Sequence, residues 1–237
     1  MLASVHRIAR EKGSGFGMET RETIRNFRER GILVDVRGHQ LDPDKTGLVL
    51  VTCGDCDRTP ENILFIRKVV DHSRLHELKL NGASLRIAKE SPLNGEFPTD
   101  RILLEDIAES CMLKGIRVIA LCGQYPCGKG ASAGLGFKEN LDLAVRGKMR
   151  IKAEVPLLMQ EMMRRQGTLV PDLPVIKVAM FMHVDYEDRA STMRTYFVSR
   201  ERWEAHHAST DGTATVFSPS LPPPEPTDNH DDTDIAV

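Results

Sequence analysis

The sequence of 237 residues contains no long hydrophobic run. No window approaches the roughly 18 apolar residues that a membrane-spanning helix needs. The N-terminal segment MLASVHRIAREKGSGFG also lacks the apolar core of a secretory signal. We therefore expect no membrane association and a cytoplasmic location. The Arg-containing, acid-poor N-terminus leaves an organelle transit peptide open.

The chain contains few cysteines, and their number is odd. The five cysteines are unevenly spaced along the chain. A disulfide framework uses an even set of cysteines in a short secreted chain, so this pattern argues against one. The sequence predicts reduced thiols in a cytosol-like compartment.

A strong net charge is also lacking, because the formal charge is −2 at pH 7. Residues 211–237 carry six acids and no Lys or Arg, which leaves 28 acidic against 32 basic residues in the rest of the chain. So small an excess of positive charge in residues 1–210 attracts nucleic acid poorly, and we expect no nucleic-acid partner. With 41% hydrophobic residues, the length suits one globular domain with a sizeable core.

Composition divides the chain into four segments. Residues 1–17 are polar and Gly-rich, which predicts a flexible N-terminus. Residues 18–44 begin with a charged helical pattern, METRETIRNFRER, and are predicted to form an N-terminal helical arm. Residues 45–208 hold the globular domain. Residues 209–237 lack periodicity and hold five of the 13 prolines, which predicts a disordered acidic tail.

Strand and helix patterns alternate through the globular domain. We expect strands at 47–52, 116–121, 175–183 and 194–198, a short strand and turn at 78–87, and helices at 60–78, 99–114, 137–146 and 152–166. For the helix at 99–114, Thr99 is the expected cap and Gly115 the stop. The alternation predicts an α/β fold with a central, mostly parallel sheet flanked by helices.

Two cysteine-bearing loops follow two of the predicted buried strands. The first reads VTCGDCDRTP (51–60) and the second ALCGQYPCGKG (120–130). The C-terminal ends of parallel strands lie at one edge of a sheet, so the loops can face each other. Thiolates are soft zinc ligands, which makes Cys53 and Cys127 candidate ligands. We interpret Cys111 and Cys122 as packing residues within a helix and a strand.

Cys127 precedes the segment Gly128-Lys129-Gly130, which is typical of the start of a helix or of a tight turn. Backbone N–H groups and the charge of Lys129 would lie beside the sulfur there. We expect both to favour thiolate over thiol.

These loops resemble the zinc motifs of the β-class carbonic anhydrases. Cys53-Gly54-Asp55 is similar to the start of that family's Cys-x-Asp-x-Arg, and residues 124–128 match His-x-x-Cys-Gly in spacing. Asn81-Gly82-Ala83 and the helix from Leu103 to Lys114 resemble the segments between the motifs, and the likeness covers about residues 45–200. The resemblance implies a β-carbonic-anhydrase-like fold, Zn²⁺ and a homodimer or dimer of dimers joined through the N-terminal arm.

The resemblance also implies a reaction. An active member would be a lyase that hydrates CO2 or a related small-molecule substrate through zinc-bound hydroxide. Cys53 and Cys127 would hold the metal. Asp55 would orient the water, and Arg58 would pair with Asp55.

Three departures from the family pattern keep an alternative open. Gln124 stands where the family has its zinc histidine, and a neutral amide oxygen is a poorer ligand than imidazole. Arg58 comes one residue late. Cys56 completes a Cys-x-x-Cys spacing and is a further candidate ligand, but a third thiolate raises the pKa of bound water. The alternative is a catalytically silent relative with a structural or regulatory role.

Two less favoured interpretations use the same loops. The segment CGDC is typical of a thiol–disulfide redox pair, although Asp55 and Asp57 disfavour a second thiolate at Cys56. Residues 123–130 differ from a phosphate-binding loop at Gly130, where such a loop needs Ser or Thr. We interpret His183, at the end of a strand, as structural.

Overall fold

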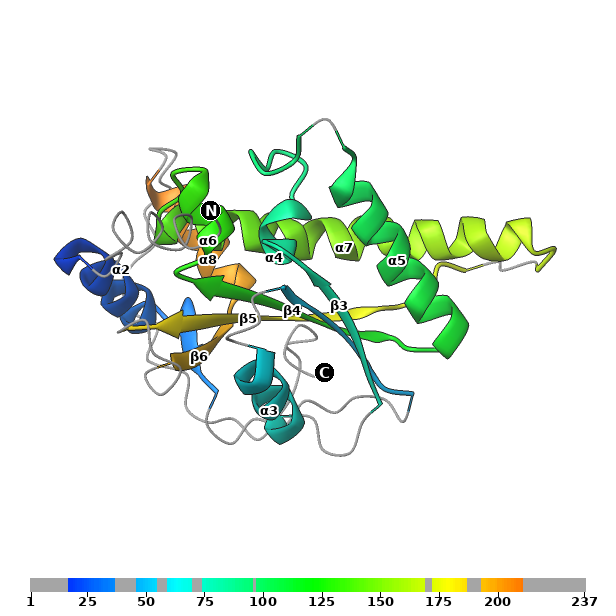
Figure 1. Ribbon diagram of the computed structural model, residues 1–237, viewed down its shortest axis with the longest axis horizontal. Coiled ribbons are helices and arrows are strands. Elements are labelled where there is room, and N and C mark those ends of the chain that lie inside the picture. Colours follow the sequence, from blue (N-terminus) through cyan, green and yellow to red (C-terminus); the bar gives the residue numbers. More distant parts are fainter. Residues whose placement is uncertain are drawn as a thin grey trace, which may run out of the picture.

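The protein folds around a six-stranded sheet in the order β1-β6-β5-β4-β2-β3 (Figure 1). Strands β2, β3, β4 and β5 run parallel to their neighbours in this group, whereas β6 pairs antiparallel with β5 and with β1. The predicted α/β fold with a mostly parallel sheet is therefore confirmed. The computed structural model describes residues 17–36, 46–54, 59–69, 74–95, 97–168, 172–186 and 193–210.

The strands are short and several are buried along their whole length. Their bounds are β1 Leu33–Asp35, β2 Leu48–Cys53, β3 Leu75–Leu80, β4 Val118–Tyr125, β5 Lys177–Asp185 and β6 Met193–Val198. Every residue of β2 and of β4 is buried. Continuous apolar runs are typical of parallel strands covered on both faces, which is the basis of their prediction from sequence.

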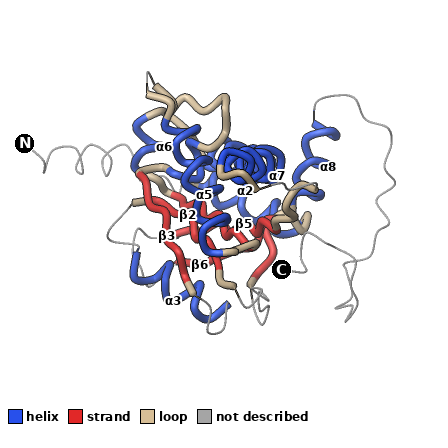
Figure 2. The backbone as a smooth tube through the Cα atoms, turned by 90° about the vertical axis from the view of Figure 1, so that its right-hand side faces the viewer, coloured by secondary structure: helices blue, strands red, loops and turns tan. Residues whose placement is uncertain are grey.

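Helices cover both faces of the sheet. Their bounds are α2 Met18–Glu29, α3 Thr59–Val69, α4 Ala83–Arg86, α5 Thr99–Lys114, α6 Gly128–Ser132, α7 Phe137–Arg165 and α8 Arg200–Thr210. Helices α4, α5 and α7 pack on the face that carries Ile119 and Leu121 of β4. Helix α3 packs on the opposite face with Ala120 and Cys122, and Figure 2 shows it below the strands. No described helix is long and apolar enough to cross a membrane.

The N-terminal helix predicted at 18–30 is confirmed as α2. Its buried residue Phe27 packs edge-on against Trp203 of α8, with ring centroids 5.5 Å apart, and against Phe137 of α7. Most of the predicted flexible N-terminus and of the acidic tail lies outside the described residues, as do residues 37–44 of the predicted arm. The role of the arm in a dimer stays a prediction.

Three sequence-based boundaries are wrong. The helix predicted at 60–78 ends at Val69, because Leu75–Leu80 instead pairs with β2 as the parallel strand β3. The strand expected from residue 78 and its turn are present, but the strand starts earlier, at Leu75, and the turn at residues 81–82 leads into the one-turn helix α4. Pairing with a neighbouring strand overrides local helix propensity here. The strand predicted at 116–121 continues to Tyr125 as β4.

The two helices predicted at 137–146 and 152–166 are one helix, α7, of 29 residues. Gly147 lies in its middle and serves close packing: a Cβ at this position would lie 3.1 Å from the carbonyl oxygen of Ser84 in α4. Helix α5 has its predicted bounds and ends at Gly115 with φ +67°. Its N-cap is Pro98 and not the expected Thr99, which is the first residue of the helix and donates its hydroxyl to the carbonyl of Phe97.

Candidate functional site

Cys53 and Cys127 meet at the C-terminal edge of the parallel strands. Cys53 is the last residue of β2, and Cys127 lies between the end of β4 and α6. Their side chains are hydrogen-bonded to each other. The exposed fractions are 7% for Cys53 and 3% for Cys127, and both pack in one cluster with Leu85 and Leu143. The structure thus brings together the two thiols that the loops predict as partners.

Backbone N–H groups surround the thiol pair. The amide of Gly82 donates to Sγ of Cys53 at 3.2 Å. The amides of Lys129 and Gly130, at the start of α6, donate to the sulfur of Cys127. Gly82 has φ +70°, and a Cβ there would lie 3.2 Å from the Cβ of Lys129. Glycine therefore lets the β3–α4 turn pack against α6 and bring its amide to the sulfur.

The pKa of Cys127 is nevertheless raised. The hydrogen bond with Cys53 is the largest cause, burial is the second, and the amides of Gly130 and Lys129 oppose both. The amides of Gly130 and Lys129 favour the thiolate, as expected, but in the metal-free pair the hydrogen bond with Cys53 and burial outweigh them. A bound cation would reverse this balance by replacing the shared proton.

The thiol pair fits part of a zinc site. Two soft donors match two corners of the tetrahedron that zinc prefers. Among the described residues, no group of three or more His, Cys, Asp and Glu side chains could hold a metal ion. The remaining candidates Asp55, Cys56 and Arg58 lie outside the described residues, so their roles stay predictions.

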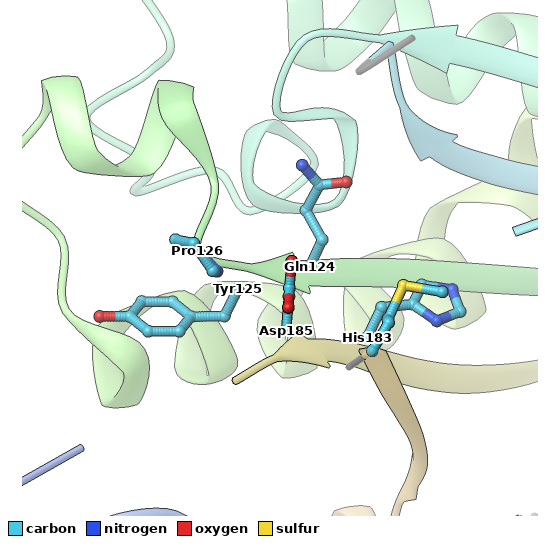
Figure 3. Close-up of a pocket in the computed structure, with 6 residues that line it drawn as sticks. Gln124, Tyr125, Pro126, His183 and Asp185 are labelled. Carbon is cyan, nitrogen blue, oxygen red and sulfur yellow. The ribbon is translucent and has the colours of Figure 1, made fainter. Parts of the chain in front are cut away.

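Gln124 lies among other neighbours at the same edge. Gly123 faces Ser84 of α4, so the alternation of a strand directs Gln124 to the face covered by α3. It is in register with His183 of β5. Together with Asp185 these side chains line a cavity of about 10 Å³, which has room for about one water molecule (Figure 3). That Gln124 faces a metal stays a prediction.

His183 and Asp185 form the polar part of this cavity with Gln124. His183 is 1% exposed, and its Nδ1 bonds the hydroxyl of Thr195 at 2.7 Å. Burial lowers the pKa of His183 to about 4, so the ring is neutral at neutral pH. Its Nε2 has no hydrogen-bond partner within the described part of the chain. The sequence signal for this group would have been the pairing of β4 with β5, which a single sequence does not show.

The remaining described cysteines are packing residues, as predicted. Cys111 and Cys122 are buried in two different core clusters, on opposite sides of the sheet. The segment at 123–130 does not form a phosphate-binding loop, because Gly123 to Tyr125 belong to β4 and pair with β5. Only Pro126 and Cys127 separate that strand from α6.

No family model and no curated protein matches the sequence. Among solved structures, the chain is similar to a mutant of the β-carbonic anhydrase CafD from the filamentous fungus Aspergillus fumigatus, with 11% identity, a TM-score of 0.35, and coverage of 68% of this chain and 99% of that one. It is also similar to β-carbonic anhydrase isoform I from the protozoan Trichomonas vaginalis, with 12% identity, a TM-score of 0.31, and coverage of 76% and 96%. A third match is the β-carbonic anhydrase CcaA, with 12% identity, a TM-score of 0.33, and coverage of 77% and 82%.

Proposed function

We propose that the chain is a zinc-binding, β-carbonic-anhydrase-like protein whose metal is held by Cys53 and Cys127, and that it hydrates CO2 or a related small molecule. The observation that carries this proposal is the buried, hydrogen-bonded thiol pair where two parallel strands end. Soft thiolate donors at such an edge suit zinc. The motif resemblance at Cys53-Gly54-Asp55 and at residues 124–128 supplies the reaction class.

The residues of the chain would divide the work as follows. The amides of Gly82, Lys129 and Gly130 stabilise negative charge on the two sulfurs once their protons leave. The apolar side chains of Leu85 and Leu143 keep bulk water from them. Zinc bound there would supply Lewis acidity, which lowers the pKa of water so that it can add to CO2 and give bicarbonate and a proton.

The sequence motifs suggest the remaining metal ligands and the residues that would lie beside the reacting water. Cys56 and Gln124 are the candidates for the remaining protein ligands. We assign Asp55 to orienting the reacting water and Arg58 to pairing with Asp55. All of these assignments rest on the resemblance of the two cysteine loops to the family motifs.

The test is CO2 hydration by zinc-loaded protein in a stopped-flow pH-indicator assay. We expect activity above the uncatalysed rate in the wild type and its loss in Cys127→Ser. Cys122→Ala is the control, because it removes a buried thiol from β4, the strand that precedes Cys127, on the face covered by α3, and it should keep the activity. Equal rates with and without Cys127 would contradict the proposed reaction.

A second candidate is a catalytically silent relative with a structural or regulatory role. It is favoured by the position of Gln124, which lines a small cavity with His183 and Asp185. A full complement of zinc that depends on Cys127, together with no hydration, would select this candidate over the first.

A further inference from the structure

We propose that Cys53 and Cys127 form a reversible disulfide in the metal-free protein, which makes the thiol pair a site of redox modification. This inference goes beyond the proposed function and does not require that zinc binds. It rests on the contact between the two side chains, which are 74 positions apart in the sequence and already share a hydrogen bond.

The two cysteines are placed where a small movement can close the bond. A disulfide needs its sulfurs about 2.05 Å apart, closer than a hydrogen bond brings them. Cys53 ends β2, and Cys127 has extended backbone angles of φ −115° and ψ 120° in the short connection before α6. Neither cysteine lies in the middle of a paired strand. Forming the disulfide would therefore shift only the end of β2 and the connection before α6, and the sheet would stay in place.

The two thiols and one molecule of hydrogen peroxide are sufficient for a balanced oxidation to the disulfide. Hydrogen peroxide converts one thiol to a sulfenic acid and releases one water molecule. The second sulfur then attacks the first, loses its proton and expels the hydroxyl as a second water. Two electrons pass from the sulfur pair to the peroxide, and a dithiol reductant reverses the change. A small neutral oxidant suits thiols that are only 7% and 3% exposed.

The chain contains its own reference thiols. Cys111 and Cys122 lie in apolar clusters that include neither Cys53 nor Cys127. Oxidation of the pair should therefore leave these two cysteines as thiols. The competing product is a bond between Cys53 and Cys56 in the segment CGDC.

Peptide mapping distinguishes the two products. Trypsin releases residues 46–58 with Cys53 and Cys56, and residues 118–129 with Cys122 and Cys127. In the double variant Cys56→Ser, Cys122→Ala, only a bond from Cys53 to Cys127 can join these peptides. We expect metal-free variant treated with hydrogen peroxide to give the joined pair, and a reductant to separate it again. Sulfenic or sulfinic acid at either cysteine without a joined pair would overturn the inference.

Two further measurements complete the test. If the double variant does not fold, the wild type is mapped in the same way, with fragmentation assigning the bonded sulfurs. A bond to Cys56 in place of Cys127 would overturn the inference there. Protein loaded with zinc should form the bond at least about tenfold more slowly, because metal and disulfide use the same sulfurs. If zinc does not slow the cross-linking, the result would support the disulfide and would contradict only the proposed metal site.

Discussion

At the scale of single residues, neighbours decide what each described cysteine can do. Burial raises the pKa of Cys111 to about 11, and that thiol packs among helix and strand side chains. Cys53 and Cys127 are also buried, but each has a second sulfur and backbone amides beside it. Residue type and burial are similar for all of them. The adjacent sulfur is what suits Cys53 and Cys127, and not Cys111, to the proposed metal-binding and redox roles.

Replacing Gln124 tests its assignment as a metal ligand. We expect Gln124→His to lower the Kd for zinc at least about tenfold, because imidazole is a much better donor than a neutral amide. Isothermal titration with zinc against a chelator of known affinity measures the change. Met193→His is the control, since it adds an imidazole to the wall of the same cavity outside the motif. An unchanged Kd would place residue 124 outside the metal site.

The sequence predicted the cysteine pair but not the surroundings of Gln124, for a physical reason. Cys53 and Cys127 each follow a buried apolar run closely, and the ends of parallel strands meet at one edge. The neighbours of Gln124 depend on how far β4 extends and on its register with β5. Long-range pairing sets both, and no local pattern near residue 124 carries that information.

At the scale of elements, the short helix α6 holds the amides that face Cys127. Asn140 of α7 packs closely against Gly130 of α6. A Cβ on Gly130 would lie only 2.7 Å from Oδ1 of Asn140. The Asn140 amide donates to the carbonyls of Leu135 and Gly136 and cannot easily turn away. Close contact between α6 and α7 thus positions the donors to the sulfur.

A pair of glycine substitutions tests this contact. Gly130→Ala should destabilise the protein by about 1–3 kcal/mol, the usual cost of overpacking, and should weaken zinc binding by displacing α6. Gly128→Ala is the matched control in the same helix, because a Cβ there meets nothing within 4 Å. Urea unfolding and zinc titration measure both effects. Equal stability of the two variants would contradict the account of α6.

Element boundaries were predictable where one residue marks the end. Gly115 marked the end of α5, and the apolar runs of β2 and β4 marked buried strands. The start of strand β3 was not predictable, because the sequence LHELKL is compatible with a helix until it pairs with β2. Gly147 suggests a break in α7 but serves its packing against α4.

At the scale of the whole molecule, packing of α3 on the sheet buries an ionisable ring. His183 lies beneath Phe65 of α3, with ring centroids 5.4 Å apart, and burial holds its pKa at about 4. The unfolded chain returns this group to its ordinary pKa near 6.5. The unfolded state therefore binds the proton more readily, and acid favours unfolding.

Stability should follow this difference in pKa. We expect the contribution of His183 to be complete above about pH 6.5 and to be lost as the pH falls toward 4, by about 3 kcal/mol in total. His183→Asn keeps a polar group near Thr195 and cannot titrate, so its stability should fall less over the same range. Chemical unfolding at several pH values measures both. Parallel pH profiles for the two proteins would contradict this assignment.

The central claim is that Cys53 and Cys127 together hold a metal ion, and metal content per chain tests it most directly. Untagged protein is purified under reducing conditions without chelator and analysed by mass spectrometry for zinc. Cys53→Ala, Cys127→Ala and the control Cys111→Ala are prepared in parallel. We predict about one zinc per chain in the wild type and in the control, and its loss in both other variants. Zinc that persists in Cys53→Ala and Cys127→Ala, or a wild type reconstituted with zinc that retains none, would contradict the account.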